Sequence, residues 1–139
     1  MNTSDRRTIV IVDDEKSYID LLANMLAEHL SHPVVTFTRP LAALDALPCL
    51  DPGLIVTDYY MPQLNGLQFI TRARALKPYT PFILITGHGV HLSNEELPEV
   101  PELRAVLHKP FGWRKLADEI IRCWSGTDVP SIKHEMVSN

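Results

Sequence analysis

The side chains most able to do chemistry in this sequence follow short apolar runs, each typical of a buried strand. The set comprises Asp13, Asp14, Glu15, Asp58, Thr86 and Lys109. Taken singly, each is more often an ordinary turn, capping or solvated residue. Together they fall at the ends of four separate runs, and the carboxyl ends of parallel strands meet at the sheet edge where ligands bind. We therefore expect these side chains to converge on one site.

A site of this composition suits phosphoryl transfer. Three crowded carboxylates, those of Asp13, Asp14 and Asp58, would repel one another and need a cation, and an all-oxygen cluster favours Mg2+. A carboxylate can attack phosphorus to give an acyl phosphate. This transfer depends on charge neutralisation more than on acid–base catalysis. The metal would offset charge on one side of the phosphoryl group and Lys109 on another, while the Thr86 hydroxyl would hold a third oxygen beside Gly87.

Strand-like and helix-like segments alternate along the chain. Strands are predicted at residues 8–12, 33–37, 54–57, 81–86 and 103–108. Helices are predicted from apolar residues at helical spacing at 17–30, 38–47, 65–77 and 113–124. The alternation favours a parallel sheet with helices on both faces. A further helix is expected between the last two strands, but Pro98 and Pro101 restrict it to a short or irregular one near residues 94–97.

The bulk composition limits the class of protein. A chain of 139 residues with 45% hydrophobic and 22% charged residues suits a single globular domain. We expect this domain at residues 8–124, between an N-terminal extension (1–7) and a polar tail (125–139). The net charge of -4 argues against direct binding of nucleic acid, and Cys49 and Cys123 have no metal-site spacing. Because no membrane span or signal peptide is visible, we expect a cytoplasmic protein.

Four motifs in the sequence resemble those of the receiver domains of two-component response regulators, the CheY-like superfamily. They are IVIVDDE, IVTDYYMPQLNG, ILITG and HKPF, in the family's order and spacing across about residues 8–124. The resemblance implies an α/β fold, a doubly wound, flavodoxin-like, five-stranded parallel sheet with strand order 2-1-3-4-5 and five helices. It also implies a sensor histidine kinase or histidine phosphotransfer protein as a partner, together with a downstream protein target that the sequence does not identify.

The resemblance also implies roles for individual residues. Asp58 resembles the phosphoacceptor, Thr86 the switch hydroxyl, and Lys109 the phosphate-binding lysine with a cis bond to Pro110. The implied ligands of Mg2+ are Asp13, Asp14, Asp58 and the backbone carbonyl of Tyr60, with Asp13 acting largely through water. Such a protein is not an enzyme for other substrates, since it catalyses only its own phosphorylation and dephosphorylation.

Some positions depart from the family pattern. Val106 stands where the family often has an aromatic residue, so we expect the switch to use backbone or helix motion. Tyr60 and His88 flank the site, and we expect them to slow the access of water and alter the lifetime of the phosphoryl group. His88 and His91 are expected to be solvated rather than to bind metal. The acidic segment 94–103 is either a solvated loop or an altered partner surface.

The sequence leaves several functions open. The first is a stand-alone receiver that signals through protein contacts, because no output domain follows Trp124. The others are the receiver portion of a hybrid histidine kinase, a phosphate sink, and a phosphorylation-independent scaffold. A phosphohydrolase of the haloacid dehalogenase type also uses an Asp at a strand end. That family requires a second Asp two residues later, where this chain has Tyr60.

Overall fold

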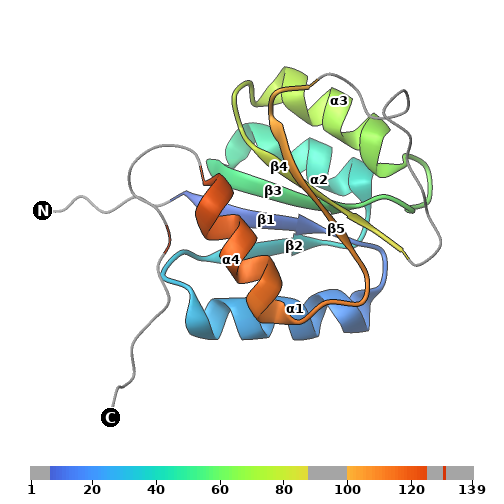
Figure 1. Ribbon diagram of the computed structural model, residues 1–139. Coiled ribbons are helices and arrows are strands. Elements are labelled where there is room, and N and C mark those ends of the chain that lie inside the picture. Colours follow the sequence, from blue (N-terminus) through green and yellow to red (C-terminus); the bar gives the residue numbers. More distant parts are fainter. Residues whose placement is uncertain (1–6, 88–99, 125–129, 131–139) are drawn as a thin grey trace, which may run out of the picture.

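The centre of the molecule is a parallel sheet of five strands, in the order β2-β1-β3-β4-β5 (Figure 1). The structure is a computed structural model, and it describes residues 7–87, 100–124 and 130. The strands are β1 (Thr8–Val12), β2 (Val34–Phe37), β3 (Pro52–Asp58), β4 (Phe82–Thr86) and β5 (Leu103–His108). The predicted flavodoxin-like sheet with strand order 2-1-3-4-5 is therefore confirmed.

Helices cover both faces of this sheet. They are α1 (Lys16–His29), α2 (Pro40–Ala46), α3 (Gly66–Leu76) and α4 (Trp113–Cys123), with a short 3-10 helix η1 (Leu47–Cys49). Helices α1 and α4 lie on one face, and α2 and α3 on the other (Figure 1). The described part of the chain thus contains four α-helices, against five predicted, and the helix predicted near 94–97 lies outside the described residues.

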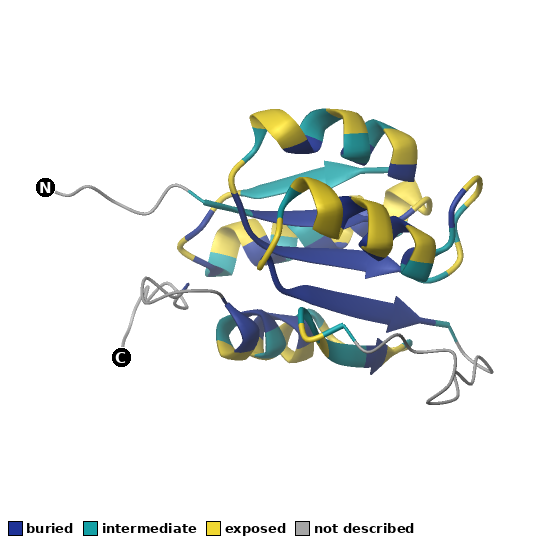
Figure 2. Ribbon diagram, turned by 90° about the horizontal axis from the view of Figure 1, so that it is seen from above, coloured by how far each residue is buried: buried dark blue, intermediate teal, exposed yellow. Residues whose placement is uncertain are grey.

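The central strands are apolar throughout because both of their faces are buried. Along β1, Ile9 and Ile11 pack toward α1 and α4, while Val10 and Val12 pack toward α2 and α3. Figure 2 shows the same pattern as dark blue central strands between helices that are buried on one side and exposed on the other. Polar side chains can enter this layer only where the strands end, and that is where the candidate site residues lie.

Several element boundaries differ from the prediction. Strand β3 begins at Pro52 rather than at residue 54, because Pro52 pairs with Thr8 of β1 before the register shifts by one residue. Helix α3 begins at Gly66, directly after Asn65, which caps it. None of the helices in the described ranges combines the length and hydropathy that a bilayer span requires.

Candidate functional site

Three carboxylates meet at the carboxyl edge of the sheet. Asp13 follows β1 directly, and Asp58 is the last residue of the neighbouring strand β3. The register that pairs Val12 with Thr57 brings these two carboxylates side by side. One carboxylate oxygen from each of Asp13, Asp14 and Asp58 lies within 4.8 Å of the others. The expected convergence of the three aspartates is therefore present in the structure.

The three carboxylates differ in their exposure to solvent. Asp13 is 1% exposed and Asp58 is 7% exposed, whereas Asp14 is exposed. The backbone N–H of Glu15 donates a hydrogen bond of 2.9 Å to Oδ1 of Asp13, which fixes the orientation of that carboxylate. The cluster thus has a buried part, formed by Asp13 and Asp58, and an exposed part, formed by Asp14.

The electrostatics of the cluster favour a bound cation. Burial, together with the nearby carboxylate of Asp13, raises the pKa of Asp58 to about 6, and the ammonium of Lys109 acts in the opposite direction. Burial also raises the pKa of Asp13. Lys109 therefore does not fully offset the negative charge. The donor set consists of carboxylate oxygens alone, so it fits a hard divalent cation such as Mg2+.

Lys109 lies opposite the acidic cluster and is shared among several carboxylates. Its Nζ is 3.3 Å from Asp13 Oδ2, 3.4 Å from Glu15 Oε1 and 3.7 Å from Asp58 Oδ1. Burial by itself would lower the pKa of this ammonium, but attraction to Asp13 and Asp58 outweighs the effect of burial and leaves the pKa raised. Lys109 is therefore a permanent cation that faces the acceptor carboxylate.

Two contacts hold Lys109 in this position, one through its backbone and one through its side chain. Its backbone N–H donates a hydrogen bond of 2.8 Å to the carbonyl of Thr86, and the Lys109–Pro110 peptide bond is cis, as the resemblance implied. In addition, its Nζ lies 4.5 Å from the centroid of the Tyr18 ring on α1. A cation over an aromatic face is attracted to it. The sequence reading missed this role because Tyr18 fits the apolar spacing of α1.

Thr86 ends β4 and is fully buried. Its Oγ1 is 2.8 Å from Nδ1 of His108 and donates a longer hydrogen bond of 3.5 Å to the carbonyl of Leu107. Both bonds run toward β5, although Asp58 lies on the other side of β4, across from Ile85. His108 is a residue that the sequence reading did not single out, since nothing in the sequence shows which side chain lies beside Thr86.

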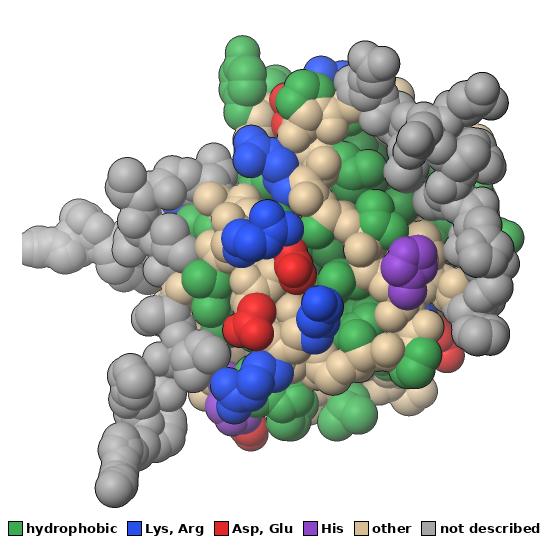
Figure 3. Space-filling view, viewed as in Figure 1, with side chains coloured by type: hydrophobic (Ala, Val, Ile, Leu, Met, Phe, Trp, Pro, Cys, Tyr) green, Lys and Arg blue, Asp and Glu red, His purple; other side chains and the backbone are tan. Residues whose placement is uncertain are grey.

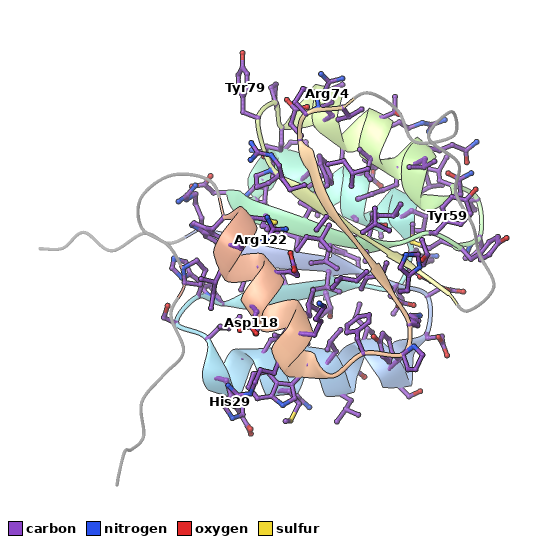
Figure 4. All side chains as sticks on the ribbon, in the orientation of Figure 1. His29, Tyr59, Arg74, Tyr79, Asp118 and Arg122 are labelled. Carbon is purple, nitrogen blue, oxygen red and sulfur yellow. The ribbon has the colours of Figure 1, made fainter. Side chains whose placement is uncertain are left out.

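The loop between β3 and α3 passes directly beside the site. The carbonyl of Tyr59 accepts a hydrogen bond of 2.7 Å from the backbone N–H of Gly66, and Asn65 and Gln68 cap α3 through reciprocal bonds of 2.9 Å. Tyr59 packs against the core beneath α2 and α3, at the carboxyl edge of the sheet (Figure 4).

Two predicted features of the site remain predictions. Tyr60 is 63% exposed and meets the ring of Tyr59 edge to face at 4.9 Å, and its backbone carbonyl is the predicted fourth metal ligand. His88 and His91 lie outside the described residues. The position that is often aromatic in the family holds Val106, which is partly buried against the core under α2 and α3.

Comparison with known proteins agrees with this geometry. Residues 9–121 match the response regulator receiver domain. The chain is 38% identical over 106 residues to the transcriptional regulatory protein FixJ of Bradyrhizobium diazoefficiens, covering 74% of this chain and 49% of that protein. It is 28% identical over 114 residues to the response regulator receiver protein CpdR of Brucella abortus, covering 82% and 93% respectively.

A solved structure agrees as well. The crystal structure of FixJ-N superimposes with a TM-score of 0.69 and 29% identity, covering 86% of this chain and 94% of that one. The chain spans about half or less of the length of the first curated relatives that it matches. Because the family match extends over nearly the whole described fold, and the strand ends carry the acidic cluster and the lysine, the chain belongs to the response regulator receiver domains of two-component signalling.

Proposed function

We propose that this receiver accepts a phosphoryl group on Asp58 in a Mg2+-dependent reaction, and that the acyl phosphate switches its contacts with other proteins. Receiver domains accept phosphoryl groups from histidine kinases. The observation that carries the proposal is the cluster of Asp13, Asp14 and Asp58, with Lys109 Nζ 3.7 Å from the Asp58 carboxylate. The proposed donor is the phosphohistidine of a sensor kinase or of a histidine phosphotransfer protein.

Asp58 supplies the nucleophile in the proposed reaction. At pH 7 it is mostly ionised, because its pKa is about 6. A carboxylate oxygen attacks phosphorus and forms a P–O bond, while the P–N bond to the donor imidazole breaks and the electron pair stays on the imidazole nitrogen. Burial of Asp58 leaves this oxygen less solvated than a surface carboxylate, so less water must be displaced before the attack.

The remaining residues handle charge and position. Lys109 already lies between Asp13 and Asp58, so its ammonium can offset the charge of a phosphoryl oxygen bound to Asp58. When bound, Mg2+ would neutralise further phosphoryl charge, and the proposed ligands are Asp13, Asp14, Asp58 and the backbone carbonyl of Tyr60. The Thr86 hydroxyl is the proposed donor to a third phosphoryl oxygen.

The proposed output is a change of protein contacts, and the protein catalyses only its own phosphorylation and dephosphorylation. The match to the receiver protein CpdR extends over 93% of that relative, which supports a receiver that acts without a fused output domain. A receiver within a hybrid histidine kinase would use the same chemistry at Asp58. The net charge of -4 supports a protein target rather than nucleic acid. We also propose a cytoplasmic location, where a histidine kinase would donate its phosphoryl group.

Intact mass measurement after incubation with Mg2+ and acetyl phosphate or phosphoramidate tests this function. We expect a mass increase of one phosphoryl group, which is lost in Asp58→Asn and when EDTA replaces Mg2+. Asp51→Asn is the matched control, because Asp51 is an exposed aspartate just before β3, at the opposite end of that strand. Phosphate that persists in Asp58→Asn would contradict the assignment. No mass increase with either donor would favour the phosphorylation-independent scaffold.

A further inference from the structure

The hydroxyl of Thr86 has a side-chain partner that the family pattern does not supply. Thr86 is fully buried, and a buried hydroxyl without a hydrogen bond destabilises the protein. Its shortest described bond, 2.8 Å, is to Nδ1 of His108 on the neighbouring strand. The second, to the carbonyl of Leu107, is 3.5 Å and correspondingly weaker. His108 is therefore the principal group that holds the Thr86 hydroxyl toward β5.

The sheet register explains why His108 occupies this place. Thr86 pairs directly with His108, and Leu84 pairs with Val106, in the parallel ladder between β4 and β5. Residues two apart on a strand point to the same face, so His108 lies on the same face of β5 as Val106. A ring is thus present beside Thr86 even though Val106 leaves the usual aromatic position aliphatic.

His108 also reaches the surface. It is exposed, on the edge strand of the sheet, and it lines a hollow beside β5 together with Lys115, Glu119 and Arg122. Lys and Arg side chains gather on this face, which α4 and β5 form (Figure 3). A rearrangement of the imidazole would therefore alter a charged surface that a partner protein can contact, whereas Thr86 itself is inaccessible to a partner.

We propose that His108 is the positioning residue that holds the Thr86 hydroxyl in the unphosphorylated protein, and that phosphorylation of Asp58 breaks this hydrogen bond and releases the imidazole at the edge of β5. This inference rests on the proposed function, because it needs the Thr86 hydroxyl to turn to a phosphoryl oxygen. It replaces the expectation of a switch by backbone or helix motion alone with a side-chain relay between two paired residues.

Binding of beryllofluoride, a mimic of the phosphoryl group, in the presence of Mg2+ measures the restraint. His108→Leu removes the competing partner of the Thr86 hydroxyl, so we expect it to bind the mimic roughly threefold to tenfold more tightly than the parent. His108→Asn retains a hydrogen-bonding group and is expected to stay near the parent affinity. A folded His108→Leu protein that binds with parental or weaker affinity would overturn the proposal, because a merely structural role would not tighten binding.

Nitrogen NMR of the histidine rings in the full chain tests the bond itself. Before phosphorylation, we expect the Nδ1 signal of His108 in Thr86→Val to differ from that of the parent, and the signal in Thr86→Ser to match it. Once phosphoramidate is added to the parent, we expect its signal to move toward the Thr86→Val position. His29 is the internal control, since its Nδ1 bonds to the Met25 carbonyl on α1. A His108 signal that stays fixed in protein carrying a phosphoryl group by mass would refute the relay, whereas the absence of that mass increase would refute the proposed function and the relay with it.

Discussion

Replacing Asp58 by Asn should stabilise the metal-free protein at neutral and alkaline pH. The carboxylate is 7% exposed, lies beside Asp13, and is only partly offset by Lys109 at 3.7 Å. An amide of the same shape removes the buried negative charge and keeps the packing. The Asp58 carboxylate that the proposed reaction needs thus lowers the free energy of unfolding of the metal-free protein. The Asp58→Asn variant measures how much.

The magnitude follows from the pKa of Asp58, which burial and the Asp13 carboxylate raise from 3.8 to about 6. Each pH unit of difference corresponds to about 1.4 kcal/mol, so the ionised carboxylate lowers the free energy of unfolding by at most about 3 kcal/mol. Below about pH 4 the carboxyl is protonated in both states and the penalty vanishes. As the pH rises from about 4 to about 6, the unfolded chain loses its proton first and stability falls, and above that range the penalty is constant.

Urea unfolding of the parent and Asp58→Asn in EDTA, at pH 5 and at pH 8, measures this difference. We expect the variant to exceed the parent by about 2 to 3 kcal/mol at pH 8 and by clearly less at pH 5. Adding Mg2+ at pH 8 should stabilise the parent more than the variant, because a ligand that binds only the folded state raises its stability. A variant that is less stable than the parent at pH 8 in EDTA, or a difference that does not change with pH, would refute the reasoning.

Three further substitutions test other parts of the site. Tyr18→Leu removes the ring beneath the Lys109 ammonium and should slow phosphorylation of Asp58 by phosphoramidate several-fold, since such a contact is worth about 0.5 to 2 kcal/mol, whereas Tyr18→Phe should retain the parent rate. Gly66→Ala would place its Cβ 2.5 Å from the Asp58 carbonyl and 2.9 Å from the Tyr59 Cα, so urea unfolding should show a loss of about 1 to 3 kcal/mol. Gly87→Ala is the matched control, because the added Cβ meets open space, and an equal loss in both variants would contradict the steric argument. Tyr60→Ala should lose its phosphoryl group to water faster than the parent does, as followed by intact mass over time, and loss at the parental rate would show that this exposed ring does not screen the site.

The sheet was predictable because its strands are short, apolar on both faces and separated by amphipathic helices. Strand β1 was predicted with its observed ends, Thr8 and Val12, since the polar residues on both sides of it are unambiguous. The start of β3 was missed because Pro52 and Gly53 resemble a turn in isolation. Their place in the strand depends on pairing with β1, a contact between segments more than 40 residues apart in sequence.

The acidic cluster and Lys109 could be predicted because carboxyl ends of parallel strands meet at one edge. Tyr18 and His108 could not, for a different reason in each case. Tyr18 is indistinguishable by spacing from the core residues of α1, although its ring lies under a cation. His108 acquires its partner from the register between β4 and β5, which contains a shift between Phe82 and Ile83 that the sequence does not reveal.

The bonds on either side of the β3–α3 loop have a consequence for how this receiver can diversify. The Tyr59 carbonyl accepts a hydrogen bond from the Gly66 N–H. The preceding residue, Asn65, is held by two reciprocal hydrogen bonds with Gln68. The loop between Tyr59 and Gly66 is therefore closed by a hydrogen bond between its two ends, and its length is fixed. An inserted or deleted residue would break this closure and displace the end of β3, which carries Asp58. A substitution at a position such as Tyr60 leaves the length of the loop unchanged. The side chains beside the site can therefore change one at a time while Asp58 stays in place.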